Sequence, residues 1–580
     1  MRILGISAHY HDAAAALVED GIPIALAQEE RFSRVKHDPS FPKKAIEFVM
    51  RKAGAKHVEY VVFYERPFLK FERFTVSTLS FFPQSHPIFR EGMLSWIKEK
   101  MWIRDQIADH VDVDKKNILF IPHHLSHAAS AFLCSPFEEA AIVTIDGVGE
   151  WTTTAIGVGH REEIILHREI RFPHSIGLLY STFTAHLGFR VNDGEYKVMG
   201  MAPYGNPTYV EKMSKLIDVK EDGSFRLDLD YFSFHVSTSL PYNERFLDLF
   251  GSPRDPKMEH RFEQRHADIA RSIQEITERV MVNLAKKAHE DTGLNNLCIA
   301  GGVGLNSVAN YKILKETPIK NIFVQPAAGD AGAALGAALY VYFYLLGNKR
   351  KYVMEHAYYG EEYTKEEIRG FLETRNVKYE EYSDNEIINY MAEEIDKGSI
   401  LGLLQGCAEW GPRALGNRSI LADARRKDML KIVNLRVKFR ESFRPFAPSV
   451  LYEDAEELFE IPADHYPSRF MLYVCPMKNR TLLPAITHVD GSARPQVVLR
   501  QFSPRYYRLL EKFKELTGIG CFLNTSFNLS GEPIVNSPKD AYDSFSRSEM
   551  DVLVLEKFIV QKRNMPKHNE RTSRTHEEST

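Results

Sequence analysis

The chain has 580 residues, a net charge of −4 and a hydrophobic content of 44%, which is the composition of a soluble globular protein. One hydrophobic core rarely supports a chain of this length, so we expect two or more domains. The slight negative charge argues against a general nucleic-acid-binding or membrane-binding surface, and we expect neither partner.

The five cysteines are widely spaced and form no Cys-x-x-Cys pair, which favours a reducing compartment over a disulfide framework. No signal peptide precedes the first predicted strand. The longest apolar run, 331–347, has 17 residues, whereas a membrane span needs about 20. We therefore expect a cytoplasmic protein in which this run forms a tightly packed, buried helix.

The N-terminal region alternates like a β-sheet protein. Residues 2–7 predict a strand, and 13–18 and 22–27 predict two more strands joined by a hairpin turn at Asp20-Gly21. A weak repeat of this strand-turn-strand-strand order predicts an internal duplication. The strands of the repeat are predicted at 141–145, 152–158 and 163–167.

Helical periodicity dominates between 255 and 350 and is clearest over 266–290. Residues 297–300 predict a short buried strand that runs into a glycine-rich turn beginning at Gly301. Such a turn lets backbone N–H groups approach a phosphate or a nucleotide. Many glycine turns in α/β proteins serve packing alone, so both interpretations stay open.

Two histidines four residues apart, His123 and His127, begin an alanine-rich segment. On a helix they share one face and can hold a metal ion together. Asp146 follows a predicted strand and Asp330 begins a small-residue helix, which adds two carboxylates to the set. Two imidazoles and two carboxylates suit a borderline or hard divalent metal. The alternative is that the histidines are loop residues and Asp330 only caps a helix.

The charged segment 348–351 and the residues after it predict a linker, which divides the chain into domains at 1–350 and 357–562. Residues 563–580 are polar, lack a hydrophobic pattern and predict a disordered tail. Within the second domain, the segment 413–444 holds ten Lys or Arg against three acids, an excess of +7, so the remainder of the chain carries −11. We expect this basic block to face a small anion rather than to define the whole surface.

Seven stretches, taken together and in this order, resemble the NodU/TobZ family of O-carbamoyltransferases. The resemblance extends to about residue 562, and motifs of this length in one order are specific. The stretches are 5–15, 28–38, 123–128, 194–205, 326–332, 410–419 and 522–528.

The resemblance implies an α/β protein with two domains. The first would be a duplicated actin-like ATPase (ASKHA) domain similar to the tRNA threonylcarbamoyl transferase domain, and the second a YrdC-like domain. It also implies that carbamoyl phosphate and ATP form carbamoyl-adenylate and pyrophosphate in the second domain. The carbamoyl group would then pass to a hydroxyl of a sugar-containing or other natural product in the first domain, with release of AMP.

In the second domain, the resemblance and the charge pattern assign residues to ATP and carbamoyl phosphate, with Lys438 and Arg444 as catalytic groups. The even spacing of Lys438, Arg440 and Arg444 predicts one face of a strand, and arginine forks suit phosphates. A merely solvated basic face is the alternative, although aromatic residues interleave these charges. The predicted contacts are Arg413, Arg418, Lys438, Arg440, Arg444, Arg494, Ser526 and Asn528.

In the first domain, His11 and Asp12 are predicted at the reaction centre, with His11 as the base or as the partner of the carbamoyl carbonyl. The resemblance implies that His123, His127, Asp146 and Asp330 hold iron, and the ligand set also suits manganese or zinc. Magnesium would accompany ATP. The adenosine would lie beside Gly301, Gly302, Val303 and Asn306, while Lys197, Asp228 and Asp230 are further candidates for acceptor or phosphate contacts.

Two other functions remain as alternatives. A tRNA-modifying enzyme would share both domain types but needs an RNA-binding surface, which the acidic composition does not favour. An actin-like ATPase would need neither the histidine pair nor the basic second domain. The acceptor is not predicted beyond a small-molecule hydroxyl, and a symmetric homodimer is the expectation for the assembly.

Overall fold

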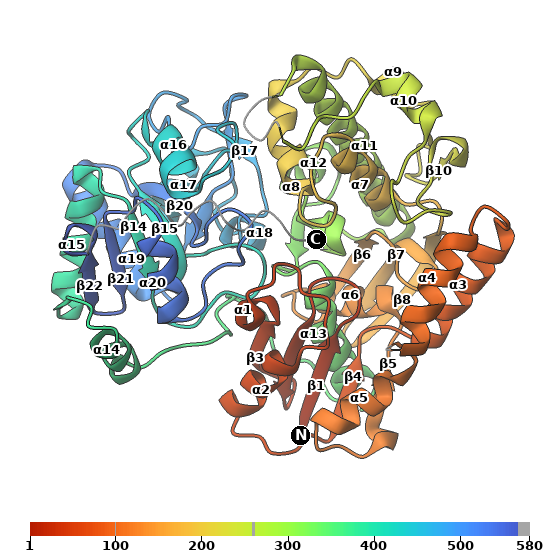
Figure 1. Ribbon diagram of the computed structural model, residues 1–580, viewed down its shortest axis with the longest axis horizontal. Helices are drawn as coiled ribbons and strands as arrows, with labels where there is room; N and C mark the ends of the chain where they lie inside the picture. The colour runs from red at the N-terminus through yellow and green to blue at the C-terminus, as the bar shows by residue number, and fades with distance from the viewer. Residues whose placement is uncertain (99, 258–261, 566–580) are drawn as a thin grey trace.

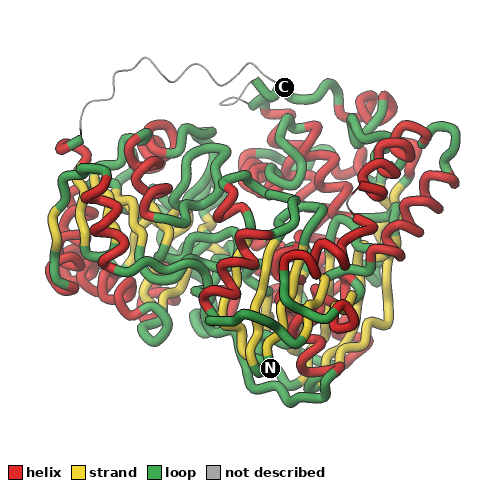
Figure 2. Tube along the Cα trace, turned by 60° about the horizontal axis from the view of Figure 1, so that its bottom comes forward, coloured by secondary structure: helices red, strands yellow, loops and turns green. Residues whose placement is uncertain are grey.

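The computed structural model describes residues 1–98, 100–257 and 262–565, which fold into two α/β parts (Figures 1 and 2). The first part contains two five-stranded sheets, and the second is built on one eight-stranded sheet. Figure 2 shows the strands of the second part gathered apart from those of the first.

The first sheet has the order β3-β2-β1-β4-β5, in which the three N-terminal strands are antiparallel and β4 and β5 run parallel to β1. The predicted hairpin turn is present, since Asp20 has φ 50° and Gly21 has φ 82°, and two positive φ values are the mark of a tight type I′ turn. The strands are β1 (Arg2–Ser7), β2 (Ala14–Glu19), β3 (Ile22–Gln28), β4 (Tyr60–Phe63) and β5 (Ile118–Phe120).

The second sheet, β12-β11-β6-β7-β8, repeats this topology strand for strand. Its first three strands in the chain are antiparallel and the last two are parallel to β6, so the predicted duplication is confirmed. This duplication agrees with the expectation of an actin-like first domain. The strands are β6 (Glu139–Ile145), β7 (Thr152–His160), β8 (Glu163–Arg171), β11 (Asn296–Ala300) and β12 (Asn321–Val324).

Helices α6 (His123–Phe132) and α13 (Asp330–Tyr340) pack on each other between the two sheets. Helix α13 contacts β1 and β2, whereas α6 contacts β6 and β11. A Cβ atom on Gly336 would lie 1.9 Å from the carbonyl oxygen of Ser126. Small residues therefore let the two helix backbones approach closely. The predicted buried helix at 331–347 is this helix, continued by a π-helical turn at Val341–Leu345.

The remaining helices of the first part surround the two sheets. Helices α3 and α4 form a hairpin at the edge of the molecule, and the long α11 corresponds to the helix predicted over 266–290 (Figure 1). A small ribbon, β9 (Ile217–Val219) and β10 (Phe225–Leu227), lies among them. The helices are α1 (Glu30–Ser33), α2 (Lys43–Lys52), α3 (Pro67–Ser80), α4 (His86–Lys98), α5 (Ile103–His110), α7 (Ile176–His186), α8 (Glu195–Met201), α9 (Val210–Met213), α10 (Glu244–Phe250), α11 (Gln264–Thr292) and α12 (Ser307–Glu316).

The second part has the strand order β13-β22-β21-β14-β15-β20-β16-β19. It is a mixed α/β sheet with helices packed on it, and the YrdC-like assignment stays a prediction. Its strands are β13 (Glu380–Glu381), β14 (Leu401–Leu404), β15 (Arg418–Ala422), β16 (Ala447–Leu451), β19 (Gln496–Val498), β20 (Cys521–Ser526), β21 (Val552–Leu555) and β22 (Phe558–Gln561), with β17 (Cys475–Pro476) and β18 (Ser492–Ala493) as a separate pair. Its helices are α14 (Lys365–Thr374), α15 (Asp384–Lys397), α16 (Met429–Ile432), α17 (Tyr452–Leu458), α18 (Tyr466–Arg469), α19 (Pro504–Thr517) and α20 (Pro538–Ser546).

The segment predicted as a linker is held against the first part. Arg350 donates to the carbonyl oxygen of Phe132 at 2.9 Å, and the amide of Met354 donates to that of Cys134 at 2.8 Å. Of the predicted disordered tail, residues 566–580 lie outside the described residues, and Lys562–Asn564 form a 3₁₀ turn.

Among the described residues, no helix has both the length and the apolar character that a membrane crossing requires.

The close contact between α6 and α13 gives a first prediction. Gly336→Ala should lower the free energy of unfolding by about 1–3 kcal/mol, because the new methyl group meets backbone that cannot rotate away. Denaturant unfolding measures the change. Gly370→Ala in α14 is the matched control, because its Cβ would enter open space and should stabilise by about 0.5–1 kcal/mol. Equal effects at both positions would contradict this account of the packing.

Candidate active site

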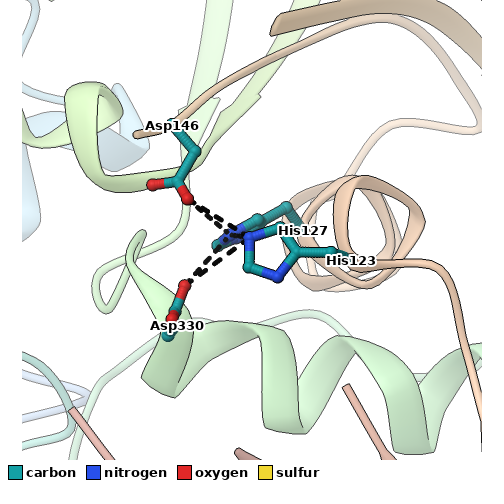
Figure 3. Close-up of side chains that lie close together, drawn as sticks. All are labelled: His123, His127, Asp146 and Asp330. Carbon is teal, nitrogen blue, oxygen red and sulfur yellow. Dashed lines mark hydrogen bonds and ion pairs between the residues drawn. The ribbon is translucent and has the colours of Figure 1, made fainter. Parts of the chain in front are cut away.

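Four side chains meet where α6, β6 and α13 converge (Figure 3). His123 and His127 begin α6 on one face, Asp146 follows β6, and Asp330 begins α13. All four are buried, and an atom of each lies within 4.8 Å of the others. The structure therefore brings together the four residues predicted as metal ligands.

The distances suit one ion in the middle of the cluster. The two imidazole Nε2 atoms are 3.1 Å apart, and Nε2 of His123 lies 3.2 Å from Oδ2 of Asp146. Oδ1 of Asp330 lies 3.5 Å from Nε2 of His127 and 3.7 Å from Nε2 of His123. Four ligands at about 2.1 Å from one ion would be separated by roughly 3.4 Å in a tetrahedron. The four residues thus fit a divalent metal.

Surrounding groups fix these ligands in place. The backbone N–H of Gly302 donates to Oδ1 of Asp146 at 2.9 Å, and the hydroxyl of Tyr64 donates to Oδ2 of Asp330 at 3.3 Å. Burial opposes charge on His123, but its bond with Asp146 and the attraction of Asp330, Asp146 and Glu150 together outweigh burial and raise the pKa of His123 to about 9. Bonds of this kind orient metal ligands before the metal arrives.

The predicted catalytic pair lies beside this cluster, at the first turn of the chain. Asp12, with φ 53°, accepts from His11 at 3.0 Å and from His37 at 2.7 Å. Burial opposes charge on His11, yet attraction by Asp330 and the bond to Asp12 raise the pKa of His11 to about 9. Without an ion on Asp330, these interactions favour the cationic imidazole, which is a donor rather than a base and suits the carbonyl-partner role of His11.

A network behind this turn was not predicted. His37 also contacts Asp193 at 3.3 Å, and Lys36 forms an ion pair with the same carboxylate. Burial opposes charge on His37, but its bonds to Asp12 and Asp193 raise its pKa to about 10. Lys36 and His37 lie in the recognised stretch 28–38, and Asp193 directly precedes the stretch 194–205. The motif resemblance therefore pointed to this region, but the sequence alone did not indicate a role for these residues.

The glycine turn follows β11. Gly301 has φ 92°, and a Cβ atom there would lie 2.2 Å from the carbonyl oxygen of Ile145, so only glycine fits. Asn306 caps α12 and exchanges two hydrogen bonds with Gln274, at 3.0 and 3.1 Å. Gly302, Val303 and Asn306 line a large cavity of the protein. Gly301, which was also predicted beside the adenosine, is not part of the wall of this cavity.

The basic residues of the second part lie on a loop, and the predicted strand face is wrong. A π-helical turn at Val433–Val437 precedes Lys438, and the next strand, β16, begins only at Ala447. The Nζ atom of Lys438 donates to the carbonyl oxygens of Ser526 and Asn528 at 2.7 and 2.9 Å. The irregular loop is stable because these carbonyls and the Asn434 side chain satisfy its buried cations.

This loop and its neighbours form a cluster of buried positive charge. Burial, and after it repulsion by Arg413, Arg440 and Arg444, holds the pKa of Arg494 well below its usual range. Burial and repulsion by Arg440 likewise lower the pKa of Lys438. Among the described residues, the Nε atoms of Arg413 and Arg494 are buried without a hydrogen-bond partner. A phosphate bound here would accept from these donors and would offset the repulsion between the arginines.

Some predicted contacts are elsewhere. Arg418 is fully buried and donates to five carbonyl oxygens, those of Glu361, Gln405, Gly406, Asn417 and Asn536. Its predicted phosphate contact is therefore wrong, because its donors already hold the loops of the second part together.

The three further candidates do not line the cavity either. Lys197 pairs with Glu441 at 3.4 Å, Asp228 caps a 3₁₀ turn, and Asp230 pairs with Arg245 on the surface.

One cavity of about 850 Å³ joins the two clusters. Its wall in the first part includes His11, Asp12 and Asp146, so the metal-ligand cluster borders it through Asp146. Its wall in the second part includes these predicted contacts: Arg413, Lys438, Arg440, Arg444, Arg494, Ser526 and Asn528.

Comparison with known proteins identifies relatives over most of the chain. It is 46% identical to the protein sll1178 of Synechocystis sp. over 98% of both chains. It is 37% identical to the nodulation protein NolNO of Sinorhizobium fredii over 95% of this chain and 79% of that one. With the 3'-hydroxymethylcephem-O-carbamoyltransferase of Streptomyces clavuligerus it shares 31% identity over 46% of this chain and 49% of the other.

Among solved structures, that of T. kodakarensis HypF overlaps 60% of this chain and 48% of its own, at 16% identity and a TM-score of 0.31, too partial a likeness for any argument.

The family model described as carbamoyltransferase N-terminus matches residues 2–339, and that described as carbamoyltransferase C-terminus matches residues 392–562. Together they span most of the sequence. The chain therefore belongs to the carbamoyltransferase family, of the NodU/TobZ type that its motifs resemble.

Proposed function

We propose that this protein is an ATP-dependent O-carbamoyltransferase that performs two reactions at the two ends of one cavity. Carbamoyl phosphate and ATP become carbamoyl-adenylate at the basic end. The carbamoyl group then passes to the hydroxyl of a small-molecule acceptor at the end bordered by Asp146 and His11, and AMP leaves. The observation that carries the proposal is the single cavity of about 850 Å³ with these two chemically different walls.

The first reaction joins two polyanions, so it needs concentrated positive charge. Arg413 and Arg494 have donors free to bind phosphate oxygens, and Arg440 and Arg444 add to the same wall. Lys438 sits at the centre of the cluster and is held by Ser526 and Asn528. The atoms balance when water takes part: carbamoyl phosphate, ATP and water give carbamoyl-adenylate, pyrophosphate and phosphate.

In the second reaction, the acceptor oxygen forms a bond to the carbamoyl carbon, and the bond from that carbon to the AMP oxygen breaks. The hydroxyl proton of the acceptor passes to the phosphate of the departing AMP or to water. Cationic His11, held by Asp12, donates to the carbamoyl oxygen as negative charge grows there. His123, His127, Asp146 and Asp330 would hold a divalent ion, which would supply positive charge near the leaving phosphate. Iron is our first assignment, with manganese and zinc as alternatives, and magnesium accompanies ATP.

The nucleotide has a binding wall of its own. Gly302, Val303 and Asn306 line the cavity beside Asp146, where the close turn lets an adenosine approach the backbone. We place the protein in the cytoplasm, which its five free cysteines support.

A pyrophosphate assay with ATP and carbamoyl phosphate tests the proposed function. The proposal predicts pyrophosphate and phosphate only when both substrates are present, and AMP together with a carbamoylated product when an acceptor is added. Mass spectrometry of a panel of aminoglycosides, macrolides, aminocoumarins, chito-oligosaccharides and hydroxymethyl cephems identifies the acceptor. Release of ADP from ATP alone would favour a simple ATPase, and modification of tRNA alone would favour the tRNA-modifying alternative.

The metal assignment predicts the content of the purified protein. His127→Ala should lower bound iron, manganese or zinc from about one ion per chain to a small fraction, because alanine offers no ligand atom in place of the buried imidazole. Elemental analysis measures the metal, and a thermal melt verifies that the variant is folded. Exposed His57→Ala is the control and should keep the ion. An unchanged metal content in the His127 variant would remove these four residues as the site.

The basic wall predicts a selective loss. Arg494→Gln should slow pyrophosphate release about 30-fold or more, because one charge-assisted phosphate bond is worth roughly 2–3 kcal/mol. The same variant should still transfer the carbamoyl group when given preformed carbamoyl-adenylate. Exposed Arg480→Gln in the same part of the chain is the control and should keep both rates. Equal loss of both reactions in folded Arg494→Gln would point to one shared reaction site.

The role of His11 is separable by two substitutions. In single-turnover transfer from carbamoyl-adenylate, His11→Ala should be slower by about 10²–10³-fold, the usual cost of losing a donor to developing charge. His11→Gln keeps a donor without a titratable proton, so it should retain clearly more activity than His11→Ala. If the two variants lose the same large factor, His11 acts as a base, and if neither loses activity, His11 has no part in the step.

A further inference from the structure

Exposed apolar side chains are concentrated on the hairpin of α3 and α4. Of the 21 large apolar side chains that are exposed among the described residues, nine lie between positions 68 and 102. Phe68 is 74% exposed and Leu79 64%, values expected for charged rather than apolar residues. The nine are Phe68, Leu69, Val76, Leu79, Phe82, Leu94, Ile97, Met101 and Trp102.

Contacts within the hairpin define which side of each helix faces the other. The rings of Phe71 and Trp96 lie 5.3 Å apart, and those of Phe74 and Phe89 lie 6.1 Å apart and are stacked. A different side of α3 faces the body of the protein, where the Arg73 guanidinium covers the ring of Phe172 at 5.1 Å. The exposed side chains lie on neither of these sides.

Each helix carries one exposed stripe at helical spacing. On α3 the stripe is Phe68, Glu72, Val76 and Leu79, and along α4 and beyond its end it is Arg90, Leu94, Ile97 and Met101. Counting 100° per residue from the mutual contacts of the antiparallel helices, both stripes fall on the same side of the hairpin, away from the body. They therefore form one face, which we call the hairpin face (Figure 1, α3 and α4).

The hairpin face is as large as the biggest apolar patch that a monomer normally exposes. Its six apolar side chains present on the order of 600 Å² of apolar surface, and the largest apolar patch on a typical monomer is about 300–600 Å². A stable dimer buries about 800 Å² of polar and apolar surface together on each partner. The six side chains, together with the charged residues of the two stripes, approach the area of one dimer interface.

Its charges are arranged for packing against a copy of itself. Each stripe has one charged position, Glu72 on α3 and Arg90 on α4. A two-fold axis along the hairpin would place α3 of one copy on α4 of the other, antiparallel and at the same height. Glu72 of one copy would then lie within reach of Arg90 of the second copy, and the reverse pair would form by symmetry.

We propose that the hairpin face is the interface of a homodimer, in which two α3–α4 hairpins form a four-helix bundle. The cavity of each copy lies outside this interface, because no residue of the hairpin lines it. The dimer proposal does not rest on the proposed function. A second copy is favoured over a lipid surface because each stripe carries a charge that its symmetric partner can neutralise.

Light scattering after size exclusion tests the proposal on the full chain at about 10 µM. Wild-type protein should show twice the chain mass of 66.5 kDa. Leu79→Glu with Ile97→Glu should give the mass of one chain, because two charges would be buried in each half of the interface. Leu516→Glu, an exposed apolar position on α19, is the matched control and should leave the dimer unchanged.

Charge reversal distinguishes a second copy from other partners. Glu72→Arg alone should weaken the dimer at least tenfold in Kd, and adding Arg90→Glu should restore it. A wild-type monomer at this concentration would overturn the proposal, as would a dimer that survives Leu79→Glu with Ile97→Glu. Binding of the wild-type monomer to anionic vesicles would instead identify the face as a lipid-binding surface. Circular dichroism spectra should be alike for all variants, since every substituted side chain is exposed.

Discussion

The site depends on how closely α6 and α13 approach each other. Helix α6 carries His123 and His127, and α13 carries Asp330, so the distance between these helices sets the size of the metal-ligand cluster. The contact between Gly336 and the carbonyl oxygen of Ser126 leaves no room for a Cβ atom, and Gly5 of β1 meets the carbonyl oxygen of Ala334 in the same way. Packing of small residues therefore brings a histidine pair and an aspartate, more than 200 positions apart in sequence, into contact.

Electrostatics divides the cavity into two ends. At one end, buried carboxylates and histidines stabilise one another. Burial disfavours the charged form of His37 and of Asp146, but hydrogen bonds and attraction between opposite charges outweigh burial. The pKa of His37 is therefore raised and that of Asp146 is lowered. At the other end, Arg413, Arg440 and Arg444 repel Arg494, and among the described residues the Nε atoms of Arg413 and Arg494 are buried without a hydrogen-bond partner. The basic end gains stability from a polyanion, whereas the other end gains it from a cation. This difference is the reason we propose adenylate formation and carbamoyl transfer at opposite ends.

Several of these features could be predicted from the sequence because they are local. Alternating apolar residues and the Asp20-Gly21 turn predict the first three strands, and their repetition predicts the second sheet. The four-residue spacing of the histidines places them on one helix face. The meeting of His123 and Asp330 was predicted from their ligand types and their positions at the ends of predicted elements, and the motif resemblance implied it as well. No local pattern encodes a contact across that separation.

Other features depend on tertiary contacts between distant segments, which the local sequence pattern does not indicate. The spacing of Lys438, Arg440 and Arg444 favours a strand, yet carbonyl oxygens of Ser526 and Asn528 and the side chain of Asn434 hold these residues in a loop. Arg418 and Arg413 lie in the same recognised stretch, 410–419, so the sequence does not distinguish them. In the structure, the donors of Arg418 bind five carbonyl oxygens and hold loops of the second part together. His37 was missed because its importance comes from lying between Asp12 and Asp193.

The central claim is that adenylate formation and carbamoyl transfer use different ends of one cavity, and only the second needs the ion of the four-residue cluster. The most direct measurement follows pyrophosphate and AMP from ATP, carbamoyl phosphate and acceptor, using wild-type protein stripped of transition metals by a chelator, with magnesium restored. We expect pyrophosphate release to continue for at least one turnover while AMP release stops, and to see AMP release return when the transition metal is added back. Loss of both products on stripping, or AMP release that persists without the metal, would contradict the account.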